Sequence, residues 1–73
     1  MATLYDFWIT IQDLGDEQAK KLWLTHRRGS IHCTVFPDKA FIYGVTDEEK
    51  IQAIIDDIIK LGKDYGLVRK EVI

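Results

Sequence analysis

The side chains with obvious chemical reactivity are few in this chain: one cysteine, Cys33, and two histidines, His26 and His32. A histidine beside a cysteine can activate the thiol as a nucleophile, and both residue types bind zinc. His32 and Cys33 are consecutive in a run of alternating residues, so in a strand their side chains point to opposite faces. We therefore expect neither a catalytic Cys/His pair nor, with so few ligands, a four-coordinate zinc site within the chain.

The other polar residues indicate no further reaction centre. His26 falls on the apolar stripe of a predicted helix, where a histidine usually packs with its ring nitrogen satisfied. Asp56 and Asp57 are adjacent on a second predicted helix, about 100° apart, so we expect them to face solvent. No serine accompanies a base, and there is no glycine-rich phosphate loop. We therefore expect no catalytic residue, no metal and no cofactor, and a chain that is not an enzyme.

Length and composition narrow the class of protein. A chain of 73 residues and 8.5 kDa predicts a single domain over residues 1–73. The hydrophobic share of 47% and the charged share of 30% are typical of a folded domain. No apolar run approaches the ~18 residues of a membrane span, and the N-terminus lacks a signal-peptide layout, so we expect a cytoplasmic protein with no membrane partner. The net charge of -2 favours neither nucleic acid nor an anionic membrane.

The first two elements differ in the period of their apolar residues. Residues 4–12 alternate, which predicts a strand. Its apolar face is formed by Tyr5, Phe7, Ile9 and Ile11. From Asp16 to Arg28 the spacing becomes that of one helical stripe, made of Ala19, Leu22, Trp23 and His26. Gly29 then stands where a helix commonly ends.

Two further alternating runs, residues 30–36 and 39–45, are separated by Pro37 and Asp38, which predicts a tight hairpin. A two-residue turn sets the register and places Val35 opposite Ala40. Paired residues share a face of the sheet, so one face is apolar or small throughout. It comprises Ile31, Cys33, Val35, Ala40, Ile42 and Gly44.

The second helix begins with a capping box, in which Thr46 is the cap and Glu49 stands three residues later. Its buried stripe comprises Ile51, Ile54, Ile55, Ile58 and Leu61. We expect the helix to continue to Tyr65, with Gly62 inside it at a cost of about 1 kcal/mol relative to alanine; an end at Gly62 is the alternative. Residues 67–73 are expected to form a last strand.

The predicted order is strand, helix, strand, strand, helix, strand. Short connections and right-handed crossovers favour a four-stranded antiparallel sheet with both helices packed on one face. This α+β arrangement resembles the ferredoxin-like βαββαβ fold, which implies that the first and third strands are central. Copper chaperones of that fold carry a C-x-x-C loop after the first strand, where this chain has Asp13-Leu14-Gly15-Asp16, so the resemblance does not extend to metal transport.

With the helices on the apolar face, the opposite face is left open. We expect it to bind the partner through Trp8, Thr10, His32, Thr34, Phe36, Phe41 and Tyr43. The run from Lys39 to Thr46 resembles the third strand of the RNA-recognition motif in Lys39, Phe41 and Tyr43, which implies base stacking. Thr10 stands where that family has an aromatic residue. The basic residues Lys20, Lys21, Arg27 and Arg28 fall on a helix, away from this face.

We expect this face to bind protein, because interface cores are rich in aromatic residues and poor in charge. The partner is a second copy in a homodimer, or a larger assembly on which the chain acts as an inhibitor or adaptor. Leu24, on the polar side of the first helix, is a minor candidate contact. Single-stranded nucleic acid is the alternative partner. A third interpretation is that residues 1–4 or 72–73 fold across part of the face, or that its aromatic residues only stabilise pairs across neighbouring strands.

Overall fold

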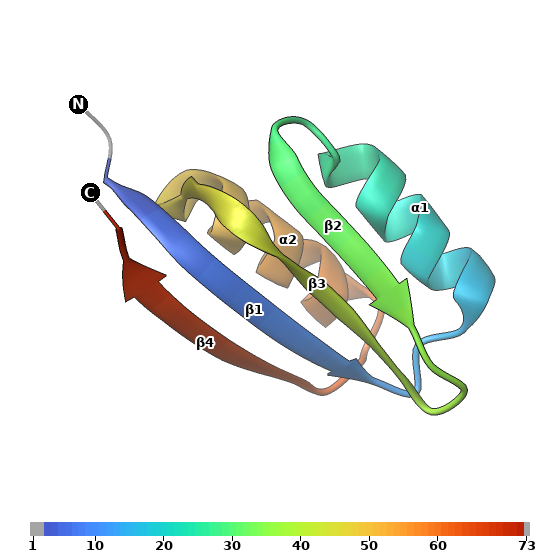
Figure 1. Ribbon diagram of the computed structural model, residues 1–73. Coiled ribbons are helices and arrows are strands. Elements are labelled where there is room, and N and C mark those ends of the chain that lie inside the picture. The colour runs from blue at the N-terminus through green and yellow to red at the C-terminus, as the bar shows by residue number, and fades with distance from the viewer. Residues whose placement is uncertain (1–2, 73) are drawn as a thin grey trace.

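The computed structural model describes residues 3–72, which fold into one sheet and two helices packed together (Figure 1). In chain order the elements are β1 (Leu4–Gln12), α1 (Asp16–His26), β2 (Ser30–Val35), β3 (Lys39–Asp47), α2 (Glu48–Lys60) and β4 (Tyr65–Glu71). The strands lie in the order β2-β3-β1-β4, and every neighbouring pair is antiparallel. The predicted α+β, ferredoxin-like fold is therefore confirmed, with β1 and β3 in the centre.

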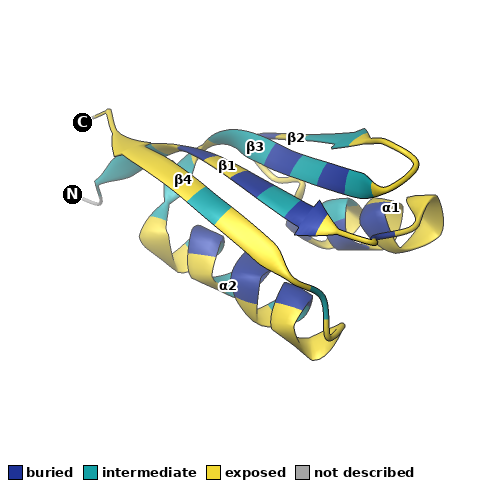
Figure 2. Ribbon diagram, turned by 90° about the horizontal axis from the view of Figure 1, so that it is seen from below, coloured by how far each residue is buried: buried dark blue, intermediate teal, exposed yellow. Residues whose placement is uncertain are grey.

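Both helices lie on the same side of the sheet, as Figure 2 shows. The core between them and the sheet draws on every element except β4, whose Leu67 packs against it half-buried. Its fully buried larger side chains are Phe7, Ile9, Ile11, Leu14, Ile42, Ile51, Ile54 and Ile58. The predicted apolar faces of β1 and α2 thus meet in one cluster.

The hairpin register is confirmed, with Val35 opposite Ala40 and Cys33 opposite Ile42. The Phe36 amide donates to the Lys39 carbonyl at 2.8 Å and closes the turn. Val35 shares the apolar face but is 36% exposed, because β2 is an edge strand. At the other end of the hairpin, a Cβ on Gly44 would lie 1.8 Å from the Ser30 carbonyl oxygen, and its φ is 149°, so only glycine fits.

Both ends of α2 differ from the prediction. The cap is Asp47, not Thr46: the Asp47 carboxylate accepts from the Lys50 amide at 2.9 Å. The helix ends at Lys60 rather than at Tyr65, because Gly62 adopts a left-handed conformation with φ 71° and the chain turns there. Tyr65 instead begins β4, and Leu61, expected in the buried stripe, is 40% exposed.

Smaller corrections concern the other ends and one loop. The helix α1 ends at His26, two residues before Arg28, and its C-cap is Arg27 rather than Gly29. Strand β3 runs on to Asp47, and β4 begins before residue 67. Ile73 of the predicted strand lies outside the described residues. No helix within residues 3–72 has the length and apolar character to cross a membrane.

Candidate docking face

The sheet register brings the predicted partner-binding residues to one face, opposite the helices, which we call the open face. One row across the sheet is His32, Tyr43, Trp8 and Val68; the next is Thr34, Phe41, Thr10 and Gly66. Side chains of paired residues lie on the same side of a sheet, so each row presents its residues together. Phe36 follows the end of β2, and its ring reaches the Phe41 ring.

The rings of this face form one continuous aromatic cluster: His32, Tyr43, Trp8, Phe41 and Phe36. Trp8 lies at its centre, with its ring centroid 4.6 Å from that of Tyr43 and 5.0 Å from that of Phe41. Phe36 meets Phe41 edge-on at 5.3 Å, and His32 meets Tyr43 at 5.6 Å. The rings therefore support one another across three strands, β2, β3 and β1.

The aromatic cluster is accessible yet already ordered. Trp8 is 42% exposed and Phe36 43%, whereas Phe41 and Tyr43 are half-buried. The Tyr43 hydroxyl and the Thr34 hydroxyl share a hydrogen bond of 3.0 Å, so the polar end of the tyrosine is satisfied within the face. The cluster thus presents exposed apolar surface whose rings already hold one another in place.

Two valines enlarge this surface beyond the predicted residues. Val68 is 71% exposed at the end of the Trp8 row, and Val45, 38% exposed, follows Tyr43 along β3. The alternation of Phe41 and Tyr43 could have extended the face to Val45. Val68 could not be assigned, because the alternation of the last strand is poor.

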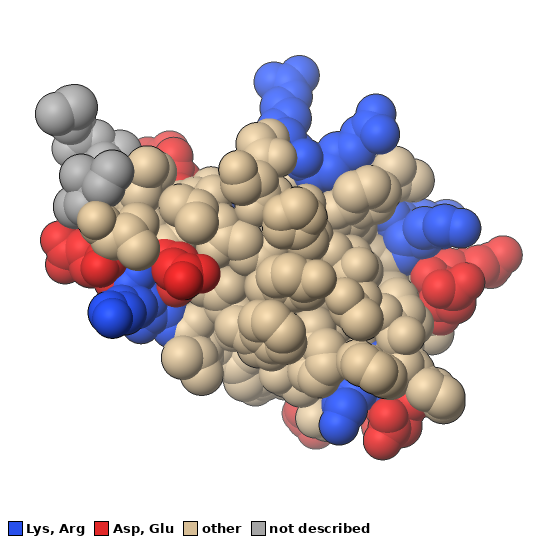
Figure 3. Space-filling model, in the orientation of Figure 1, with Lys and Arg blue, Asp and Glu red and all other residues tan. Residues whose placement is uncertain are grey.

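Charged residues lie at the margin of the open face. Figure 3 views this face and shows an uncharged centre with Lys/Arg and Asp/Glu side chains around it. Lys39 places its Nζ 5.8 Å from the Phe41 ring centroid. Asp6 and Lys70, partners across β1 and β4, line a shallow hollow of about 430 Å³ beside Trp8 and Tyr43. The margin thus carries both signs of charge rather than a basic track.

The basic residues of the first helix lie elsewhere, as expected. Lys20 and Lys21 belong to α1, and Arg27 and Arg28 follow its end. Because α1 packs on the opposite side of the sheet (Figure 2), these residues do not belong to the strand rows that form the open face. Leu24 is 50% exposed on the same helix.

His32 and Cys33 lie on opposite sides of the sheet. His32 is exposed and contacts Tyr43, whereas Cys33 is partly buried against the core. Burial, and to a smaller extent the Asp16 carboxylate, raise the pKa of the Cys33 thiol above its usual value. A raised pKa keeps the thiol protonated, which is its unreactive form.

His26 and Asp57 join the two helices. The His26 ring is buried, and its Nε2 lies 2.6 Å from the Asp57 carboxylate, so the expected packed histidine is confirmed. The expectation for Asp57 was wrong: its side chain is 34% exposed and turns toward α1. Periodicity within one helix gives no sign of a contact between residues 31 positions apart. The other ring nitrogen, Nδ1, is buried without a partner within residues 3–72.

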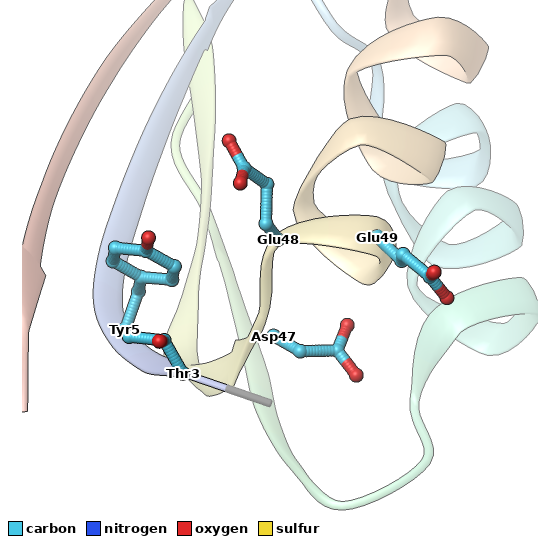
Figure 4. Close-up of a pocket in the computed structure, with 5 residues that line it drawn as sticks. All are labelled: Thr3, Tyr5, Asp47, Glu48 and Glu49. Carbon is cyan, nitrogen blue, oxygen red and sulfur yellow. The ribbon is translucent and has the colours of Figure 1, made fainter. Parts of the chain in front are cut away.

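A second hollow, of about 260 Å³, lies at the start of α2 and is lined by Thr3, Tyr5, Asp47, Glu48 and Glu49 (Figure 4). Two of its three carboxylates, those of Asp47 and Glu48, already have structural partners, and the third points away from that of Glu48. Asp47 caps the helix, and Glu48 forms an ion pair of 2.9 Å with Arg69. Figure 4 shows Glu49 directed away from Glu48. Among residues 3–72, no three His, Cys, Asp or Glu side chains are arranged to hold a metal ion.

Comparison of the chain with known protein families, curated proteins and solved structures gives no match. A ferredoxin-like fold by itself supports many unrelated functions. The assignment of function therefore depends on the open face.

Proposed function

We propose that the chain is a non-catalytic protein-binding module whose docking surface is the open face. The observation that supports this proposal is the aromatic cluster, a contiguous set of rings with an uncharged centre and a charged margin. Protein interfaces have this anatomy, because their cores are enriched in Trp, Tyr and Phe and depleted in charge, while their rims are polar.

Trp8 is the anchor of the proposed interface. It touches both Tyr43 and Phe41, and 42% of it remains exposed for a partner to cover. Central Trp and Tyr residues supply much of the binding energy in protein interfaces. The contacts that already hold the Tyr43 ring and hydroxyl reduce the conformational entropy lost on binding.

The partner we favour is a second copy of this chain, because an uncharged aromatic face is complementary to another such face. The other occupant is an apolar surface on a larger protein, on which the chain acts as an inhibitor or adaptor. The two occupants differ in one measurable property: only the first gives the isolated chain a concentration-dependent association that a substitution on the open face lowers.

Single-stranded nucleic acid is the competing ligand, by the resemblance of Phe41 and Tyr43 to base-stacking residues. Two observations count against it. The Trp8 and Tyr43 rings stack on each other with planes only 20° apart, so each covers a face that a base would need. Lys70 lies beside Asp6, whereas Lys39 lies opposite Gln12 at the other end of β1, so these cations do not form the continuous basic groove that binding of a nucleic-acid backbone requires.

The test is sedimentation analysis of the chain over increasing concentration, with Phe41→Ala as the variant and Leu24→Ala as the matched control. Leu24 is an exposed leucine on α1, behind the sheet. We expect Phe41→Ala to lower the association while the helical circular dichroism stays nearly unchanged, and Leu24→Ala to leave both unaltered. High salt should hardly weaken an apolar contact, because it screens charges only.

A titration with short single-stranded oligonucleotides gives the result that would contradict the proposal. If short single strands bind at micromolar concentration, lose affinity as salt rises and no longer bind the Phe41→Ala variant, the face stacks bases and the protein-docking proposal is wrong. Unfolding of Phe41→Ala would also contradict it, since the face would then be part of the core.

A further inference from the structure

The two edge strands of the sheet, β2 and β4, differ in whether another element bonds to their outward backbone groups. At the β2 edge, the Ile31 carbonyl points away from β3 and accepts a hydrogen bond of 3.0 Å from the Trp23 indole of α1. At the β4 edge, no strand or helix within residues 3–72 pairs with the outward backbone. Unpaired edges invite pairing with another strand.

The backbone groups that β4 leaves free follow from its register with β1. Gln12 donates to the Asp64 carbonyl at 2.9 Å, and Val72 donates to the Leu4 carbonyl at 3.0 Å, at the two ends of this pairing. Hydrogen-bonded pairs alternate in an antiparallel ladder, so the even-numbered residues of β4 bond to β1. The N–H and C=O groups that point outward are those of Tyr65, Leu67, Arg69 and Glu71.

Apolar side chains flank this edge on both sides of the sheet. Val68 is 71% exposed on the open face, and Tyr65 is 40% exposed on the helix side. Ile59 of α2 is 57% exposed and lies three helical turns from Glu48, on the same side of the helix. Since Glu48 pairs with Arg69 of β4, Ile59 also faces the β4 side.

We propose that β4 pairs antiparallel with β4 of a second copy, about a two-fold axis at Val68. In this register Tyr65 meets Glu71 of the partner subunit, and Leu67 meets Arg69 of the partner subunit. All the outward N–H and C=O groups then find partners. The two Val68 side chains become neighbours on the open face, in a pair that is not hydrogen-bonded and therefore closely spaced.

The bounds of β4 favour this register, because Val68 is the middle of its 7 residues and the whole strand then pairs without like charges facing each other. Lys70 stands opposite Gly66, and neither Arg69 nor Glu71 faces a like charge. The two Arg69 side chains are diagonal neighbours, and each already has Glu48 of its own chain. In a two-fold antiparallel pair the axis passes between a residue and its own copy, so the alternative registers place the axis at a neighbouring residue. Moving the axis to Arg69 sets the two arginines directly opposite each other. Moving it to Leu67 sets Lys70 and Glu71 opposite Asp64 and Lys63, which precede the strand, so fewer residues of β4 pair with each other.

Pairing of this kind joins the two sheets edge to edge and leaves both open faces on the same side. If those faces dock protein as proposed above, the dimer presents two aromatic clusters side by side. The edge contact itself does not depend on that function, because it uses the backbone of β4 and Val68 rather than the aromatic rings.

The experiment uses the Phe41→Ala chain, so that association through the open face is removed. Sedimentation up to millimolar concentration should show a dimer, and Val68→Lys should raise its dissociation constant about tenfold, because two like charges then stand opposite each other. Val68→Glu should do the same. An equimolar mixture of the Lys and Glu variants should restore the dimer, since only the pairing of Val68 with Val68 brings the two charges together.

The matched control is Val45→Lys, which places the same charge on the open face, on β3 and away from the edge. It should leave the edge dimer intact. The proposal is overturned if the chain stays monomeric at millimolar concentration, if Val45→Lys disrupts the dimer as much as Val68→Lys does, or if mixing the two Val68 variants restores nothing. None of these results bears on whether Phe41 binds protein.

Discussion

The two faces of this sheet are built from the same strands, but one is buried under the helices and the other is exposed. Ile9 and Ile42 are fully buried under the helices, whereas their chain neighbours Trp8 and Phe41 lie on the open face, Trp8 with 42% of its surface exposed. In a domain this small, most of the apolar area removed from water lies on the helix side. We therefore infer that one face provides stability and leaves the other free for binding, so substitutions on the two faces should separate these properties.

The largest expected effect is on the buried face. Ile54→Ala removes a side chain with no exposed surface and should lower the free energy of unfolding by about 2 to 5 kcal/mol, enough to threaten so small a domain. Ile59→Ala, on the same helix but 57% exposed, is the control and should change it by about 0.5 kcal/mol or less. Urea denaturation measures both, and equal losses would mean that the two sides of α2 are not distinct.

A glycine substitution on the same face should have the next largest effect on the free energy of unfolding. Gly44→Ala sets a methyl group against the Ser30 carbonyl at a φ of 149°, so strain and overpacking should cost about 1 to 3 kcal/mol. Gly66→Ala is the control, because its Cβ would meet nothing within 4 Å. Thermal denaturation of the two variants should show a clear fall for Gly44→Ala alone; an unaffected Gly44→Ala would contradict the close approach of β2 to β3.

The side-chain contact between His26 and Asp57, which joins the two helices, gives a third comparison. Asp57→Ala removes the partner of the buried His26 Nε2 and should cost about 1 to 3 kcal/mol, since it leaves that polar atom unsatisfied. Asp56→Ala removes only an exposed hydrogen bond with Gln52 and should cost about 0.5 kcal/mol or less. If urea denaturation gives the two variants the same stability, the contact does not hold α1 against α2.

The smallest effect on stability is expected on the open face. Phe41→Ala should lower the free energy of unfolding by only about 1 kcal/mol, because its ring packs against Trp8 and Phe36 but not in the core. The same urea titration compares it directly with Ile54→Ala. A loss as large as that of Ile54→Ala would show that the open face is a second core.

How much of this could be predicted from sequence differs between elements. Strand β1 and the hairpin were predictable, because alternation and a two-residue turn both fix which residues share a face. The end of α2 was not, since Gly62 is compatible with either a kinked continuation or a left-handed stop. Leu14 was missed as a core residue because a single buried leucine in a loop has no period.

Within the candidate site, too, some residues could be predicted from the sequence and others could not. The predicted aromatic residues share one face because they belong to strands with clear alternation. Val68 and the free edge of β4 were not foreseen, since that strand is exposed along most of its length and so carries no apolar pattern. Of the segments expected to cover the open face, Leu4 instead lies within β1, and the Val72 amide donates to the Leu4 carbonyl, so the backbone at both residues continues the sheet. Residues 1, 2 and 73 lie outside the described residues.

The most direct test of protein docking by the open face uses the chain's two tryptophans. Trp8 belongs to the aromatic cluster, whereas the Trp23 indole is held by the Ile31 carbonyl on the other side of the sheet. The indole N–H resonances of an Arg69→Pro variant should be followed by NMR as its concentration rises, because this substitution removes an outward N–H of β4 and weakens edge pairing without changing a side chain of the open face. The account predicts that the Trp8 resonance shifts while that of Trp23 stays fixed. A Trp8 resonance that is unchanged by the protein itself but moves on addition of single-stranded oligonucleotide would contradict it.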